Sequence, residues 1–172
     1  MSHSDDSRWN IDTECIHAGT EPDPAFGAVA PPIFQTSTFV FKTPEEGAAR
    51  FAGTDEGYIY TRMGNPTIAA LEESVATLEG GRSALATASG MAAVSTVFFA
   101  LLKAGDHVVC SASVYGPSRV VLERDFSRFG IRSSLVDTSD TKVLQDSIEE
   151  STKVVFVETP ANPTLAVTDL AE

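Results

Sequence analysis

The chain has 172 residues and a formal net charge of −12 at pH 7, with 42% hydrophobic and 21% charged residues. This balance predicts a soluble protein with a packed core, and the acidic charge argues against a basic face for DNA or RNA. Residues 1–10 are polar without the apolar region of a secretory signal, and the longest apolar run, Val97–Leu102, is too short to span a bilayer. We therefore expect a cytoplasmic protein with no nucleic-acid or membrane partner.

Cysteine and histidine spacing gives no indication of a disulfide or a metal site. Cys15 and Cys110 lie far apart and form no CxxC pair. The three histidines are scattered along the chain and form no ligand pattern. We expect both thiols to be free and no metal to be bound.

Residues 1–62 are interrupted by five prolines, so we interpret them as an extended N-terminal arm. The arm still carries apolar residues that need to be covered, so we expect it to pack on another surface, which a second subunit would provide. These residues are Ile33, Phe34, Phe39, Val40 and Phe41.

From residue 65 onward, helix and strand signals alternate. Asn65 and Pro66 predict the cap and first position of a helix, and apolar residues then recur at spacings of three and four. The expected helices are 66–78, 90–103, 117–129 and 140–149, the last capped by Thr138 or Ser139, and the expected strands are 83–87, 107–110, 131–137 and 153–158.

This alternation predicts an α/β fold, with a mainly parallel sheet covered by helices on both faces. We place the arm at 1–62 and the first part of an incomplete larger domain at 63–172. Ligands of such sheets bind at the carboxyl ends of the strands, so the loops that follow the expected strands are the places to look for a site.

Three of these loops carry candidate groups. Gly90 and Met91 begin an expected helix, where free N–H groups favour an anion. An ordinary turn between a strand and a helix is the alternative interpretation of these residues. Tyr115 would stand above the strand ends and stack on a flat ligand, or simply pack in its loop. Asn162 lies between two prolines and offers an amide, although a rigid turn is the alternative.

A fourth candidate lies in the arm. Arg62 has the planar fork that suits a phosphate, and Tyr60 adds a hydroxyl group. The alternative is a surface arginine beside packed aromatic side chains.

Taken in order, the motifs resemble one family. The segments YTRMGNPT, ASGMAA, VYGP and ETPANPT, preceded by IHAG and VAPPIFQTSTF, resemble the transsulfuration group, the Cys/Met metabolism family of pyridoxal-phosphate (PLP) enzymes. The resemblance covers the chain from about Thr13 to Glu172. It implies a fold-type I, PLP-dependent transferase-like architecture.

The resemblance also implies roles for single residues. Gly90 and Met91 would give backbone N–H groups to the cofactor phosphate, and Tyr115 would stack on the pyridine ring and take part in proton transfer. Asn162 would lie near the phenolic oxygen of the ring. Tyr60 and Arg62 would reach the phosphate of a neighbouring subunit, which implies a homo-oligomer with shared active sites, a dimer of dimers, acting on a small amino-acid substrate.

Two groups that the family needs are not found in this sequence. No aspartate for the pyridinium nitrogen is recognised, and the four lysines, Lys42, Lys103, Lys142 and Lys153, lie outside the context of a cofactor lysine. We therefore interpret the sequence as an N-terminal fragment that is inactive alone. A fragment that acts only by pairing with other chains is the alternative from another functional class, and a dinucleotide-binding dehydrogenase is disfavoured because GxGxxG is absent.

Within the family, the segment FKTPEEGAARFAG resembles the methionine γ-lyases most closely. These enzymes split L-methionine into methanethiol, 2-oxobutanoate and ammonia. They commonly carry a cysteine where Pro117 follows Tyr115 and Gly116. Cystathionine γ-synthase, cystathionine γ-lyase and O-acyl-homoserine sulfhydrylase therefore remain alternatives.

Overall fold

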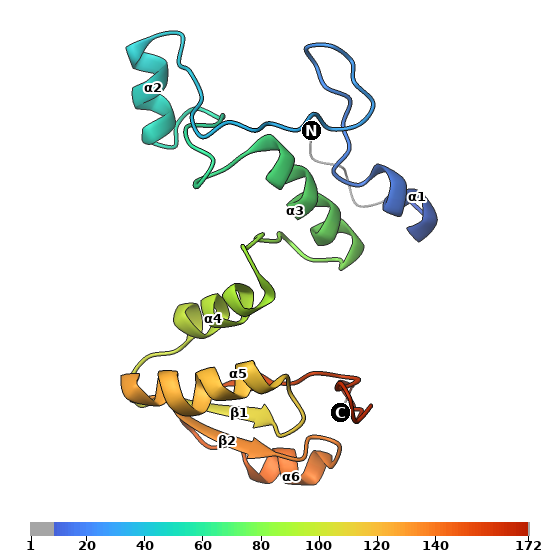
Figure 1. Cartoon of the computed structure of the whole chain (residues 1–172), viewed down its shortest axis with the longest axis vertical. Coiled ribbons are helices and arrows are strands. Elements are labelled where there is room, and N and C mark those ends of the chain that lie inside the picture. Colours follow the sequence, from blue (N-terminus) through green and yellow to red (C-terminus); the bar gives the residue numbers. More distant parts are fainter. Residues whose placement is uncertain (1–8, 172) are drawn as a thin grey trace. The chain divides into compact units, whose positions relative to one another are not determined.

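The computed structural model of the chain describes residues 9–171. It divides into two compact units, Met1–Ala86 and Thr87–Glu172 (Figure 1). Helix α3, Pro66–Leu78, lies in the first of these units. The division into an arm at 1–62 and the first part of a larger domain at 63–172 stays a prediction. The role of residues 1–62 as an arm between subunits stays a prediction.

The first unit contains three helices. Two of them, α1 at Ile11–His17 and α2 at Pro44–Phe51, lie in the segment that was expected to be irregular. Pro44 does not interrupt α2 but begins it, since the first helical position needs no N–H donor. The Thr43 side chain accepts from the N–H of Glu46 and so caps α2. The sequence T-P-E-E is typical of such a helix start.

Helix α1 packs against α3, and the chain leaves it along the α3 surface. The hydroxyl of Ser74 donates to the carbonyl of Ala18 at 2.6 Å. Gly19 has a φ of +69°, and a Cβ there would lie 2.2 Å from the carbonyl oxygen of Ala70. Only glycine therefore fits this turn, both for its left-handed backbone and for the close approach to α3.

The extended segment that follows is held by the residues around the start of α3. Thr38 and Tyr60 form an isolated antiparallel bridge. The side-chain amide of Asn65 donates to the carbonyl of Phe34 at 2.9 Å, while its oxygen accepts from the N–H of Thr67. The cap of α3 thus also fixes the arm, which explains why Asn65 is buried.

The second unit alternates helices and strands. Strands β2 (Arg132–Val136) and β3 (Thr152–Phe156) both pair in parallel with β1 (His107–Ser111), which gives the order β2-β1-β3. In register, His107 of β1 faces Arg132 of β2, and Cys110 faces Phe156 of β3. The elements are α4 (Gly90–Leu101), β1 (His107–Ser111), α5 (Gly116–Val120), a π-helical turn (Val121–Asp125), a 3-10 turn (Phe126–Phe129), β2 (Arg132–Val136), α6 (Thr141–Asp146) and β3 (Thr152–Phe156).

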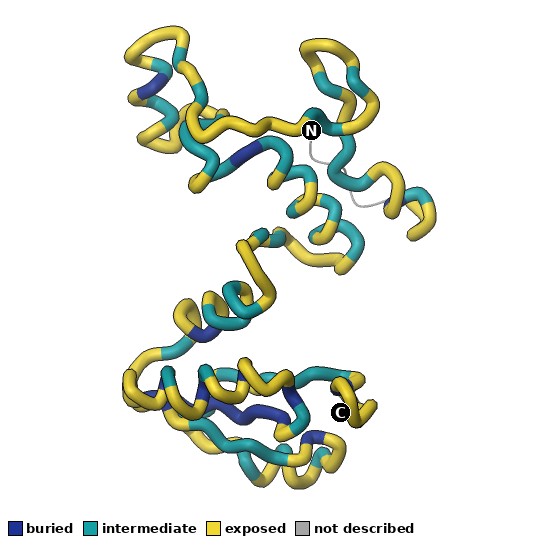
Figure 2. The backbone as a smooth tube through the Cα atoms, viewed as in Figure 1, coloured by how far each residue is buried: buried dark blue, intermediate teal, exposed yellow. Residues whose placement is uncertain are grey.

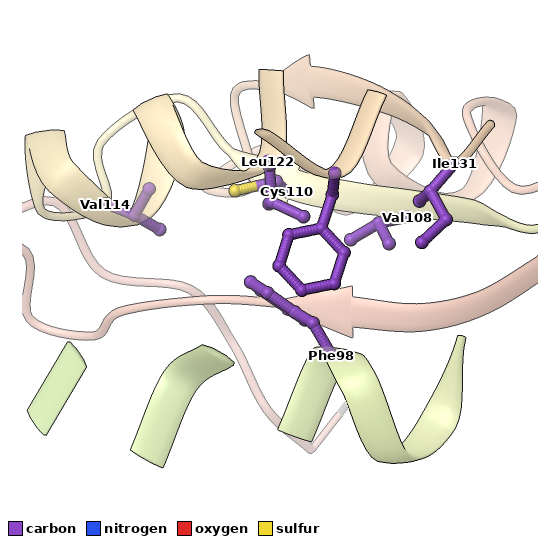
Figure 3. Close-up of a cluster of buried hydrophobic side chains, with 7 residues drawn as sticks. Phe98, Val108, Cys110, Val114, Leu122 and Ile131 are labelled. Atoms are coloured by element: carbon purple, nitrogen blue, oxygen red, sulfur yellow. The ribbon is translucent and has the colours of Figure 1, made fainter. Parts of the chain in front are cut away.

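The core of this unit forms where α4 and the helical run after α5 meet one face of the sheet. Strand β1 is buried along its whole length (Figure 2). Phe98 of α4 makes edge contacts with Phe126 and Phe156, with ring centroids 5.5 and 5.3 Å apart. Val108 and Cys110 project from β1 into the same cluster, which Figure 3 shows in close-up.

Three expected elements differ in the structure. The stretch 83–87 forms no strand, because a strand needs a neighbour for its backbone groups and the described residues offer none there. The helix expected at 117–129 is one helical run that changes from α to π and then to 3-10 before Gly130. Helix α6 ends at Asp146, and Asp140 caps it instead of Thr138 or Ser139.

Candidate functional site

A pocket of about 280 Å³ lies in the second unit, where the start of α4 meets the carboxyl ends of β1 and β3. Neighbouring parallel strands end at the same edge of a sheet, so loops that are distant in the sequence meet there. The pocket is lined by Gly90, Met91, Val94, Tyr115, Ser118, Phe156, Val157 and Glu158. It thus brings together three of the residues that the sequence singled out: Gly90, Met91 and Tyr115.

The start of α4 is the polar end of this pocket. The Ser89 hydroxyl accepts from the N–H of Ala92 at 3.1 Å and so caps the helix. Within the part of the chain that the structure describes, the N–H groups of Gly90 and Met91 have no acceptor. Open space lies where a Cβ of Gly90 would stand. Two free donors at the positive end of a 12-residue helix suit an anionic oxygen group.

Tyr115 is one of two aromatic residues that line the pocket, with Phe156. It immediately precedes α5, and 57% of its surface is exposed. Its backbone N–H is fixed, because it donates to a carboxylate oxygen of Glu158 at 2.8 Å. The ring is therefore available to a ligand while its point of attachment is held.

Asn162 does not line the pocket, but the same carboxylate holds it. The other oxygen of Glu158 accepts from the backbone N–H of Asn162 at 3.2 Å. Asn162 itself is exposed, and its peptide bond to Pro163 is cis. Glu158 was not among the residues predicted from the sequence, although an acidic residue directly after an apolar strand is a usable signal.

Tyr60 and Arg62 lie in the first unit, on the segment that leads into α3. The guanidinium carbon of Arg62 is 4.6 Å from the centroid of the Tyr60 ring, a cation–π contact. The Arg62 side chain is exposed and Tyr60 is half-buried. The pair forms a cationic surface that a phosphate can approach from solvent.

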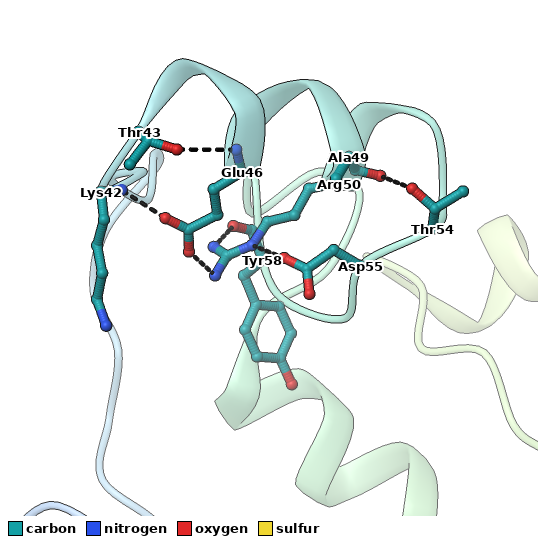
Figure 4. Close-up of polar contacts among 8 residues, drawn as sticks. All are labelled: Lys42, Thr43, Glu46, Ala49, Arg50, Thr54, Asp55 and Tyr58. Atoms are coloured by element: carbon teal, nitrogen blue, oxygen red, sulfur yellow. Dashed lines mark hydrogen bonds and ion pairs between the residues drawn. The ribbon is translucent and has the colours of Figure 1, made fainter.

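A second arginine organises this segment. Arg50 of α2 donates to the carboxylates of Glu46 at 2.5 Å and of Asp55 at 3.3 Å. It also donates to the carbonyl of Tyr58 at 3.2 Å, and Figure 4 shows all three contacts. One side chain thus ties α2 to the loop that ends in Tyr60 and Arg62.

Residues 9–171 contain neither a cluster of metal ligands nor a helix able to cross a membrane. No group of three or more histidine, cysteine, aspartate or glutamate side chains is placed to hold a metal ion. In the same residues, no helix has both the length and the apolar character needed to cross a membrane.

The pocket fits the cofactor that the sequence resemblance implies. A phosphate suits the free N–H groups of Gly90 and Met91, and a flat pyridine ring suits the exposed face of Tyr115. The roles of these residues, and those of Tyr60, Arg62 and Asn162, remain predictions about the bound state.

Comparison with known proteins identifies the same chemistry. The model of a family described as Cys/Met metabolism PLP-dependent enzyme matches residues 12–172. An L-methionine gamma-lyase of Fusobacterium nucleatum subsp. polymorphum is 46% identical over 95% of this chain, which spans 41% of that relative. A cystathionine beta-lyase, MetC, of Bacillus subtilis is 43% identical over 94% of this chain. The matched region covers 39% of the length of that relative.

Solved structures give the same result for the fold. The crystal structure of metB from Corynebacterium glutamicum matches 94% of this chain with a TM-score of 0.86 and 41% identity, over 40% of its own length. A putative O-acetylhomoserine (thiol)-lyase, metY, from Campylobacter jejuni matches 94% of the chain with a TM-score of 0.86 and 32% identity. Its description includes a pyridoxyl-lysine phosphate residue.

Proposed function

The chain belongs to the Cys/Met metabolism family of PLP-dependent enzymes, and from this we propose that the protein carrying it catalyses the α,γ-elimination of L-methionine. The observation that carries the proposal is its 46% and 45% identity to L-methionine gamma-lyases of Fusobacterium nucleatum and Porphyromonas gingivalis. The chain spans 41% and 42% of these relatives. The activity is therefore proposed for the whole protein.

The predicted site residues have separate roles in this reaction. When bound, PLP withdraws electrons from the substrate carbons beside the amino group. Gly90 and Met91 would hold its phosphate through their backbone N–H groups, and Arg62 with Tyr60 would reach the phosphate of the cofactor in a neighbouring subunit. The Tyr115 ring would stack on the pyridine, and its hydroxyl would donate a proton to the sulfur that leaves the γ-carbon.

A second assignment within the family also has support. Pro117 stands where methionine γ-lyases commonly carry a cysteine. Cystathionine beta-lyases of Bacillus subtilis and Coxiella burnetii are 43% and 42% identical to the chain. Cystathionine β-lyase activity is therefore an alternative, beside the cystathionine γ-synthase, cystathionine γ-lyase and O-acyl-homoserine sulfhydrylase activities expected from the sequence.

The shared active site is also part of the proposal. Several apolar side chains of the first unit are open to solvent, including Val29 at 84%, Ile33 at 76% and Val40 at 91% exposed. A second copy of the chain would cover them, and Arg62 would then serve the neighbouring site. A dimer of dimers is the assembly that we propose.

A product assay separates the two assignments. The full-length protein is supplied with PLP and, in separate reactions, with L-methionine, L-cystathionine or an O-acyl-homoserine plus a thiol. We expect methanethiol and 2-oxobutanoate from methionine at the highest kcat/KM. A higher kcat/KM for cystathionine or the acylated homoserine would reject the methionine assignment and support the alternative.

A further inference from the structure

The Glu158 carboxylate joins two loops that carry predicted cofactor contacts. It follows β3, lines the pocket, and is half-buried. One oxygen accepts from the N–H of Tyr115, 43 residues away, and the other accepts from the N–H of Asn162. The first of these N–H groups lies in the loop after β1, and the second lies in the loop after β3.

The geometry suits a carboxylate at this position. Both partners are backbone donors, and a carboxylate presents two acceptor oxygens, whereas an amide presents one acceptor and two donors. Hydrogen bonds to an ionised acceptor are stronger than those between neutral groups. The Tyr115 side chain makes no capping hydrogen bond at the start of α5, and the bond from its backbone N–H to Glu158 is one restraint on the loop that leaves β1.

We infer that Glu158 is a positioning residue, which keeps the Tyr115 and Asn162 loops at a fixed separation around the cofactor ring. It acts through the backbone N–H groups of Tyr115 and Asn162. The inference deepens the proposed function, because it rests on the roles proposed for Tyr115 and Asn162. Its readouts are backbone exchange and cofactor binding, which need no particular amino-acid substrate.

The test compares Glu158→Ala and Glu158→Gln with Glu150→Gln in the full-length protein. Glu150 is an exposed carboxylate just before the start of β3. It is therefore a matched control at the opposite end of the same strand. Amide hydrogen exchange follows the Tyr115 and Asn162 loops in the cofactor-free protein. Cofactor affinity and the visible circular dichroism of the bound cofactor report the geometry of the pocket.

We expect Glu158→Ala to raise exchange at both amides and to weaken cofactor affinity roughly tenfold, the scale of one lost charge-assisted hydrogen bond. The dichroic signal should change as well, and Glu150→Gln should alter none of the three. Exchange that stays slow at either amide, or unchanged affinity, would overturn the inference. If Glu158→Ala fails to fold, Glu158→Gln decides: it keeps one acceptor oxygen, so exchange should rise at one or both amides and cofactor affinity should fall, and unchanged exchange at both amides or unchanged affinity would overturn the inference. Wild-type protein that binds PLP but does not cleave methionine would reject only the proposed function.

Discussion

At the scale of single residues, Tyr115 combines an exposed ring with a fixed backbone. Its side chain is 57% exposed in the pocket, while its N–H is bound to Glu158. This arrangement suits two roles, stacking through the ring face and proton transfer through the hydroxyl. The two roles depend on different atoms, so a single substitution separates them.

We expect Tyr115→Phe in the full-length protein to keep the cofactor and lose rate. Phenylalanine retains the ring face but not the hydroxyl, and general acid catalysis by a positioned side chain contributes ~10²–10⁴-fold. The measurement is kcat for γ-elimination, with cofactor content determined in the same samples. A decrease in kcat of less than about threefold with cofactor retained would leave Tyr115 only a stacking role.

The two cysteines should differ sharply in reactivity. Cys110 is fully buried in the core, and burial, with a smaller contribution from nearby Glu123, raises the pKa of its thiol from 9.0 to about 11. Cys15 is exposed. Because the thiolate is the reactive form, native protein at pH 8 should be alkylated at Cys15 and protected at Cys110.

Peptide mapping after iodoacetamide treatment checks this, with denatured protein as the control in which both are labelled. The raised pKa of Cys110 also makes the stability of the folded protein depend on pH. The folded protein holds a proton that the unfolded chain releases, so this contribution is complete below about pH 9 and declines as the pH rises towards 11. Equal labelling of both cysteines in the native protein would contradict the buried position of Cys110.

At the scale of elements, Arg50 connects α2 to the loop that follows it. Its side chain, 18% exposed, meets two carboxylates and a backbone carbonyl. The loop carries little regular structure of its own, so its shape depends on this arginine. Tyr60 and Arg62 follow directly, which links the ion pairs to the predicted phosphate site.

We therefore expect Arg50→Ala to loosen residues 53–64 and to weaken cofactor binding roughly tenfold, because several hydrogen bonds to charged groups are lost together. Limited proteolysis should cut this loop sooner than in wild type. Arg124→Ala is the control, since Arg124 pairs with Asp125 on the surface with 71% of its side chain exposed, and such pairs contribute little. An Arg50→Ala protein as resistant and as tightly loaded as the control would contradict this role.

At the scale of the whole molecule, the proposal of shared sites has a direct test. Subunits with Arg62→Ala are mixed with subunits with Tyr115→Phe under conditions that exchange chains. If Arg62 serves the neighbouring site, one site of each mixed dimer carries both defects and the other is intact. Random mixing should then restore about a quarter of the wild-type activity.

Mass spectrometry of differently tagged subunits confirms the mixing. Confirmed mixed dimers without recovered activity would mean that Arg62 and Tyr115 serve the same chain's site. Each variant alone should stay at its own low activity throughout, which excludes recovery from refolding.

The sequence by itself determined what depends on short-range signals. Asn65 and Pro66 marked the start of α3, and Gly90 marked the start of α4, because caps and first-turn residues act within a few positions. The ordered motifs identified the family, and the family model over residues 12–172 confirms it. The same signals were present at Thr43 and Glu46 of α2 but were outweighed by the number of prolines around them.

Only the tertiary structure decided what depends on distant partners. The stretch 83–87 looks like a strand, yet a strand exists only when a neighbour pairs with its backbone. The link from Glu158 to Tyr115 spans 43 residues and follows from β1 and β3 being adjacent in the sheet. Strand order is set by packing of the whole unit around the cluster of Phe98, Val108 and Phe126, and no local pattern of residues encodes it.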